Sequence, residues 1–172
     1  MGRLAATALT ILGALFLQVT FGAPLTILGV APNFLMVAVI IIAFIRGSKE
    51  GTIVGFIAGL LFDLIGTTVV GPMALTLTLT GFVAGSMREQ MVAGSWVLPV
   101  TVLGLTSLIS ETIYLLLLTT LGLPVSFFAA LGTRALPAAL YAMLIAVIVL
   151  PWLSKLLRSG MDVEPNTLNR MN

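Results

Sequence analysis

Three ionisable residues, Asp63, Glu111 and Arg134, lie within long apolar stretches of the sequence. A charged side chain is costly at the centre of a bilayer, so each is expected to face protein or trapped water rather than lipid. We expect the two acids and the base to form an intramembrane polar cluster, with Arg134 paired first with Asp63. Such a cluster could fix the register of the helices, border a cavity or a partner's docking surface, or form part of a proton or ion pathway.

Residues for most other chemistry are missing. The chain has no histidine and no cysteine, which removes the usual general base, the commonest metal ligand and the thiolate nucleophile. The GSKEGT segment at positions 47–52 lacks the spacing of a phosphate-binding loop. We therefore expect no enzyme, no catalytic residues, no cofactor and no metal site. The basic residues occur singly or in pairs, which argues against nucleic acid as a partner.

The composition is that of an integral membrane protein. Of the 172 residues, 59% are hydrophobic and 8% are charged, and the mean hydropathy is +1.20. In soluble domains about a quarter of the residues are charged. This length fits one helical bundle. We expect a single domain over residues 1–172, with a polar cytoplasmic tail at 154–172.

Six apolar segments are expected to cross the bilayer, so the predicted fold is an all-α bundle of six transmembrane helices. Their approximate ranges are 4–21, 33–45, 51–65, 73–87, 97–121 and 131–153. The first segment could also be a secretory signal, but it is long for a signal core and no clear cleavage site follows. We interpret it as a retained span. Residues 122–130 are expected to form a loop or a short interfacial helix.

Six crossings would place nearly all basic residues on one side of the membrane. These residues are Arg3, Arg46, Lys49, Arg88, Lys155, Arg158 and Arg170, whereas Arg134 alone lies on the other side. Because cytoplasmic loops carry an excess of Lys and Arg, we expect both termini in the cytoplasm.

Glycine recurs at every fourth position of the third segment, and Asp63 follows at the same spacing. The fourth segment repeats the pattern. The glycines of the two segments are Gly51, Gly55, Gly59, Gly81 and Gly85. On a helix such residues form a ridge without side chains, along which another helix can approach closely. The ridge can serve packing within the bundle or receive the helix of another protein. Both uses can coexist, because positions four apart rotate around the helix by about 40° per step.

Several features recur along the chain in a characteristic order. They are Gln18 in the first segment, Pro32 and Asn33 at the start of the second, the third-segment motif Gly51, Gly55, Phe56, Gly59 and Asp63 followed by Gly71, and Ser107, Leu108 and Glu111 in the fifth. This combination resembles the MreD family of rod shape-determining proteins. The resemblance covers nearly the whole chain in the number, size and orientation of its spans, and the third-segment motif is its specific part.

The resemblance implies a non-enzymatic scaffold of the bacterial rod complex, or elongasome, in the cell (inner) membrane. Such proteins hold the single-span protein MreC. They thereby help to connect the MreB cytoskeleton to the RodA glycosyltransferase and its partner transpeptidase. The implied role is maintenance of cell shape and cell wall biogenesis through lateral peptidoglycan synthesis. The family is also similar in fold to the six-helix substrate-binding components of energy-coupling-factor transporters.

That second similarity supplies an alternative function, the substrate-binding membrane component of a vitamin transporter. Asp63, Glu111 and Arg134 would then contact a ligand from the outer side. Such components dock through an Ala-x-x-x-Ala motif in the first span, whereas the alanines at 5, 6, 8 and 14 of this chain never fall four apart. We therefore favour the scaffold, whose small-residue faces would receive the transmembrane helix of a partner.

Overall fold

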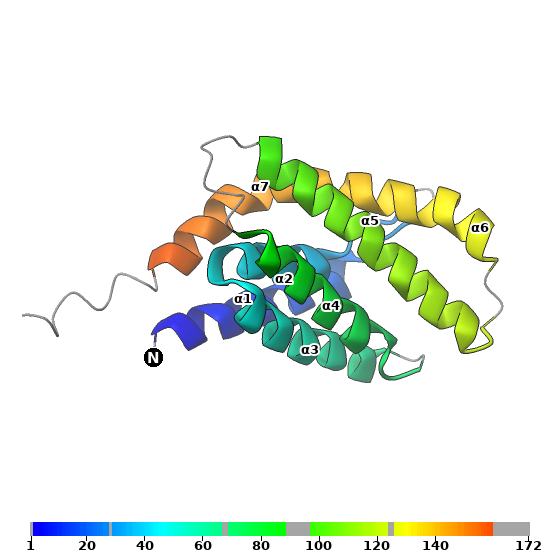
Figure 1. Ribbon diagram of the computed structural model, residues 1–172, viewed down its shortest axis with the longest axis horizontal. Helices are drawn as coiled ribbons and strands as arrows, with labels where there is room; N and C mark the ends of the chain where they lie inside the picture. Colours follow the sequence, from blue (N-terminus) through cyan, green and yellow to red (C-terminus); the bar gives the residue numbers. More distant parts are fainter. Residues whose placement is uncertain (1, 28, 67–68, 89–96, 124–125, 160–172) are drawn as a thin grey trace, which may run out of the picture.

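The computed structural model describes residues 2–27, 29–66, 69–88, 97–123 and 126–159. The helices are α1 (Gly2–Phe21), α2 (Phe34–Arg46), α3 (Ser48–Ile65), α4 (Pro72–Ser86), α5 (Val97–Thr120), α6 (Phe127–Ala130), the π-helical turn η2 (Leu131–Ala135) and α7 (Leu136–Ser159). Because α6, η2 and α7 follow one another without a break, the described residues form six helical rods (Figure 1). The predicted all-helical fold is confirmed. Arg170 and most of the predicted polar tail lie outside the described residues.

The last rod differs from its prediction. It begins at Phe127, so residues 127–130 belong to the helix and not to a separate loop or interfacial element. Its second turn is a wide π-helical turn in which the Leu136 amide donates to the Leu131 carbonyl. Pro137 follows directly, and a proline cannot donate to the residue four positions earlier. The wide turn lets the helix continue through this proline.

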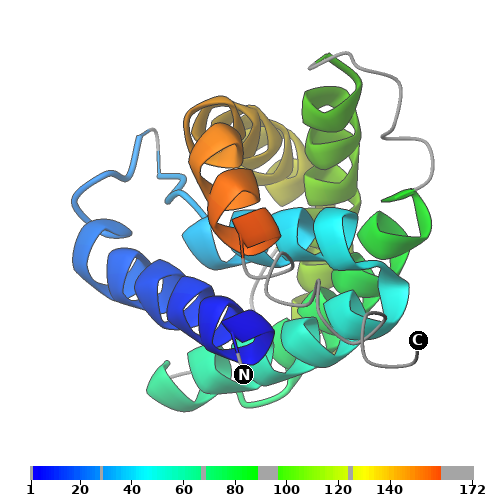
Figure 2. The same cartoon turned by 90° about the vertical axis from the view of Figure 1, so that its left-hand side faces the viewer.

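Helix α2 occupies the centre of the bundle. All residues from Leu35 to Phe44 are buried, and the helix contacts α1, α3, α4, α5 and α7 (Figure 2). A helix that is apolar on every side is stable only when it is surrounded. Its 13 residues span about 20 Å, less than the hydrocarbon core of about 30 Å. Because its neighbours cover it, α2 does not have to match the thickness of the bilayer.

Three helices in the described ranges are long and apolar enough to cross a membrane, over Arg3–Phe21, Val100–Thr120 and Phe127–Trp152. Helices α2 and α4 are apolar but shorter. Large apolar side chains cover the outward faces of the rods, with Leu4 78% and Ile148 71% exposed. These are the properties of a membrane protein, since such faces are stable against lipid and not against water.

The basic helix ends gather at one end of the molecule. The start of α1, the turn between α2 and α3, the end of α4 and the end of α7 all lie there (Figures 1 and 2). These ends carry Arg3, Arg46, Lys49, Arg88 and Lys155. The end of α3, the start of α4 and α6 lie at the opposite end (Figure 1). The bundle thus has one basic end and one end that bears Asp63 and Arg134.

Candidate functional site

Helices α3 and α4 pack backbone against backbone along the glycine ridge. A Cβ atom added at Gly55 would lie 2.1 Å from the Leu77 carbonyl oxygen, and one at Gly59 would lie 2.5 Å from that of Met73. A Cβ at Gly81 would lie 2.1 Å from the carbonyl oxygen of Gly51. These distances are far below van der Waals contact. Only glycine therefore permits this antiparallel hairpin.

The remaining glycines of the ridge are used in the same way. A Cβ at Gly51 would also meet the Cβ of Ala43 on α2 at 2.6 Å, and a Cβ at Gly85 would meet the Ser48 backbone at 2.4 Å. All five ridge glycines are buried. The interpretation as packing within the bundle is thus the one that the structure shows. The ridge leaves no free surface for another protein's helix, which corrects the expectation that this face receives one.

Asp63 caps the start of α4 with its carboxylate. Its Oδ2 atom accepts hydrogen bonds from the amides of Gly71 at 2.9 Å and Ala74 at 3.0 Å, and Oδ1 accepts one from Met73 at 3.3 Å. Pro72 lies between these donors and has no amide hydrogen to give. An anion at a helix N-terminus is stabilised by the free amides and by the helix dipole. The capping satisfies a carboxylate that is only 5% exposed.

The conformation of Gly71 completes this cap. Its φ angle is +123°, a value that side chains other than hydrogen rarely permit. The turn that brings the start of α4 back to Asp63 therefore depends on this glycine. The motif that joins Asp63 to Gly71 across eight positions is a helix-capping device between two neighbouring helices.

Arg134 is not paired with Asp63. It is exposed on η2, and the acid on which its charge acts is Glu111 of α5. The ion pairs among the described residues join Glu50 to Arg3 and Arg46, and none joins Asp63 to Arg134. The predicted pairing is wrong because the free amides of α4 already satisfy Asp63. The acid that Arg134 influences is therefore Glu111 on α5.

Glu111 has two further polar neighbours. Glu111 is a partly exposed residue, and its carboxyl group interacts with the side chain of Asn33, which precedes α2. Tyr114 lies one turn further along α5 and within electrostatic range of both Asp63 and Glu111. Sequence reasoning missed Tyr114, although its position three residues after Glu111 places the two on one helix face. Among the described residues no three acidic groups come close enough to hold a metal ion.

Gln18 fastens α1 to the start of α2. Its Nε2 atom donates to the Pro32 carbonyl at 3.0 Å, and its Oε1 atom accepts from the Phe34 amide at 2.8 Å. Asn33 caps α2 by accepting a hydrogen bond from the Met36 amide at 3.0 Å. Gln18 thus forms hydrogen bonds between α1 and the start of α2. Together these amide side chains satisfy a helix start that has no water to bind inside a bundle.

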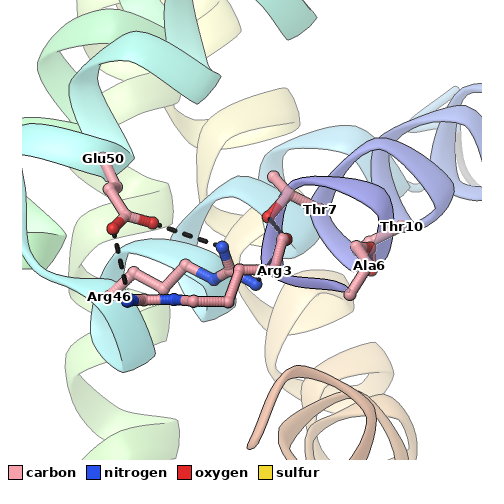
Figure 3. A network of polar contacts seen from close by, with 6 residues as sticks. All are labelled: Arg3, Ala6, Thr7, Thr10, Arg46 and Glu50. Atoms are coloured by element: carbon pink, nitrogen blue, oxygen red, sulfur yellow. Dashed lines mark hydrogen bonds and ion pairs between the residues drawn. The ribbon is translucent and has the colours of Figure 1, made fainter. Parts of the chain in front are cut away.

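A second polar network joins α1, α2 and α3 at the basic end, as Figure 3 shows. Arg46 is 8% exposed; its Nη1 lies 3.3 Å from Glu50 Oε2, and its Nη2 donates to the Arg3 carbonyl at 2.9 Å. The Arg3 side chain reaches Glu50 Oε1 at 3.4 Å. From the sequence, Arg3 and Arg46 were expected only as basic residues on one side of the membrane. Because Gly47 separates α2 from α3, the spacing of four between Arg46 and Glu50 is not one turn of a single helix and did not predict their pairing.

Buried hydroxyl groups link α4 to α5. Thr80 and Ser110 form a hydrogen bond between these helices, and the hydroxyl that accepts in this bond donates to a carbonyl one turn earlier in its own helix. Both side chains are at most 3% exposed. Sequence reasoning missed this contact, because serine and threonine in apolar helices are common wherever two helices meet.

Phe56 is the member of the third-segment motif that remains outside the bundle. It is 51% exposed, although it directly follows the buried Gly55. Other exposed or partly exposed apolar residues lie on the same side of α3. We call this surface the Phe56 face, and its members are Ile53, Phe56, Ile57, Leu60 and Leu64. Their spacing of three and four residues makes one continuous stripe along the helix.

Comparison with known proteins identifies one family. The family model described as rod shape-determining protein MreD matches residues 1–160. No curated protein matches the chain, and no solved structure matches it.

Proposed function

We propose that this chain, which belongs to the MreD family of rod shape-determining proteins, is a non-enzymatic scaffold in the bacterial cell membrane. Its task would be to hold an MreC-type single-span protein. It would thereby support the RodA glycosyltransferase, its partner transpeptidase and MreB in lateral peptidoglycan synthesis. Membership of a shape-determining family supports this role.

We infer that the rods cross the membrane six times, with both termini in the cytoplasm. The gathering of Arg3, Arg46, Lys49, Arg88 and Lys155 at one end supports this orientation, because basic residues are retained on the cytoplasmic side. Reporter fusions after Lys49 and after Arg88 would both report the cytoplasm. A periplasmic signal at either position would reject the orientation.

The partner's helix is proposed to pack on the Phe56 face. The single observation that supports this site is the exposure of Phe56. The glycines of the motif are used against α4 and Asp63 is used as a cap, whereas Phe56 has no comparable task within the bundle. An exposed aromatic side chain between Ile53 and Ile57 offers the van der Waals surface on which helices associate in membranes.

Co-purification tests this site. The chain is co-expressed with a tagged MreC-type partner and captured in mild detergent, and Phe56→Ala is compared with Phe16→Ala. Phe16 is 66% exposed on α1, so the two variants remove the same side chain from similarly exposed positions. We expect about a thirtyfold loss of captured chain for Phe56→Ala, because truncation of an interface anchor costs about 2 kcal/mol. Equal capture of the two variants would reject the Phe56 face.

The same purification separates the scaffold from the alternative function. A scaffold would bring down the single-span partner and cell wall synthases. A substrate-binding transporter component would bring down ATPase subunits, and this result would favour the vitamin transporter. The scaffold hypothesis would also fail if the native chain captured no cell wall protein at all.

A further inference from the structure

A groove runs between α5 and α7 near the basic end of the molecule. It has a volume of about 300 Å³ and is lined by Val100, Val147, Leu150 and Pro151. All four lining residues are apolar, and the volume is at the lower end of the range for ligand sites. An α-helix with its side chains is about 10 Å wide. The groove therefore suits a single hydrocarbon chain and not the helix of another protein.

A cationic group follows the groove along α7. Lys155 comes four residues after Pro151, so it lies one turn further along the same face of the helix. Its side chain is exposed, and no ion pair among the described residues includes it. Helix α7 carries no acidic residue that could neutralise it.

Trp152 marks the level at which the apolar surface gives way to the charge. It is 80% exposed and lies between Pro151 and Lys155 in the sequence. Tryptophan is enriched where hydrocarbon meets the head groups of a bilayer. The order along α7 is therefore apolar groove, indole and ammonium group, which matches the order of acyl chain, interface and head group in a phospholipid.

We propose that this groove and Lys155 bind one anionic phospholipid from the surrounding bilayer. One acyl chain occupies the groove, and the phosphate lies against the ammonium group of Lys155. The negative charge of the head group compensates a lysine that has no acidic partner in the described part of the chain. The site lies on α5 and α7, whereas the Phe56 face lies on α3. The two proposals can therefore fail independently.

Fluorescence quenching in reconstituted bilayers tests the site. The chain has two tryptophans, so Trp96→Phe leaves Trp152 as the sole reporter. Quenching is measured with phosphatidylglycerol and with phosphatidylcholine that carry brominated acyl chains. We expect about a fivefold preference for the anionic lipid, because a basic residue near a membrane surface contributes about 1 kcal/mol. The preference should weaken as salt screens the charge. Equal quenching by both lipids would overturn the proposal.

Two lysine variants locate the charge. Lys155→Gln should abolish the preference for the anionic lipid. Lys49→Gln removes a second exposed lysine at the same end of the molecule, but from α3, and should leave the preference unchanged. A preference that persists in Lys155→Gln, or that disappears in Lys49→Gln alone, would overturn the assignment.

A substitution in the groove tests the proposal that an acyl chain occupies it. Val147→Phe places a larger side chain in the groove, and Leu144→Phe adds the same ring on α7 at a position that does not line it. Val147→Phe should lower the fivefold preference toward one, whereas Leu144→Phe should retain it. Equal preference in the two variants would show that an anionic lipid contacts Lys155 without using the groove, which contradicts the proposal.

Discussion

The α3–α4 hairpin and helix α1 both contain glycine within apolar helices, but they use it differently. At Gly55 the backbone of α4 occupies the place of the missing side chain. At Gly13 of α1 nothing lies within 4 Å of that place. Glycine spacing therefore marks a helix interface only where a second backbone has filled the space. The hairpin is a closed structural unit, whereas α1 is a peripheral rod that packs on the core with one face, through Ile11 and Ala14, and adds a few polar contacts.

Helix α1 shows its peripheral position in two ways. Leu4, Leu9 and Phe16 are each more than 60% exposed, and the most specific contacts of α1 are hydrogen bonds from Gln18 and an ion pair from Arg3. In the hairpin the contacts are made by backbone atoms, which cannot rotate away. We expect substitutions in the hairpin to be more destabilising than those in α1.

The largest effect is expected for Gly55→Ala. The added methyl group would lie 2.1 Å from the Leu77 carbonyl oxygen, so α3 and α4 must separate. Overpacking of this kind costs about 3 kcal/mol when the obstacle is backbone. The shift of the unfolding midpoint in detergent measures this loss.

Two other glycines serve as controls for this substitution. Gly13→Ala should be neutral or stabilising by up to about 1 kcal/mol, because alanine is the better helix former. Gly104→Ala should be intermediate, since the atoms in its way belong to the flexible Met143 side chain. If the Gly55→Ala and Gly13→Ala variants were equally stable, the α3–α4 hairpin would not be more tightly packed at its glycine than α1.

A smaller loss is expected for Asp63→Ala. The substitution leaves three amides at the start of α4 without their acceptor, and a capping change of this kind costs about 2 kcal/mol. Asp63→Asn keeps one acceptor oxygen and should lose less. Thermal unfolding of the two variants and of the native chain in the same detergent makes the comparison.

Arg134 supplies the control for Asp63. If Asp63 were paired with Arg134, as the sequence suggested, Arg134→Gln would destabilise the chain as much as Asp63→Ala. In this structure Arg134 is exposed and acts on Glu111, so its loss should cost less than that of Asp63. Equal losses that do not add in the double variant would restore the Asp63–Arg134 pair.

The smallest effect is expected for Gln18→Leu on α1. This change keeps the volume of the side chain and removes its hydrogen bonds to Pro32 and Phe34, at a cost of about 1 kcal/mol. Val19→Leu alters an exposed neighbour and should leave the unfolding midpoint unchanged. A loss for Gln18→Leu that equals the loss for Gly55→Ala would show that α1 is as integral to the bundle as the hairpin.

Much of the fold could be predicted from the sequence. Apolar segments of the right length placed α1 to α5 within three residues of their observed ends. The start of the last rod was missed because Pro124 and the pair Phe127, Phe128 favoured a loop or a short interfacial helix over residues 122–130. In the structure the π-helical turn Leu131–Ala135 joins α6 to α7 without a break. A pattern of single residues does not reveal such a turn, since it depends on which carbonyl each amide finds.

The polar residues within the apolar helices were located from the sequence, but Asp63 was assigned to the wrong partner. Depth in the membrane suggested Asp63 with Arg134, because sequence spacing gives the height of a residue and not its direction around the helix. The backbone amides at the start of α4 bind the Asp63 carboxylate instead. Pairing charged side chains from the sequence does not take such backbone donors into account. Arg46 was underestimated for the same reason, since one of its partners is the carbonyl oxygen of Arg3.

The sequence by itself determined that this chain is apolar and helical and that its basic residues fall in alternate connections between the helices, because these properties depend on composition and on distances along the chain. Only the tertiary structure decided which helix fills the glycine ridge, which groups satisfy Asp63 and which apolar faces remain open. These outcomes depend on the rotation of each helix about its axis and on backbone atoms that every residue shares. The order of side chains along the chain does not specify them.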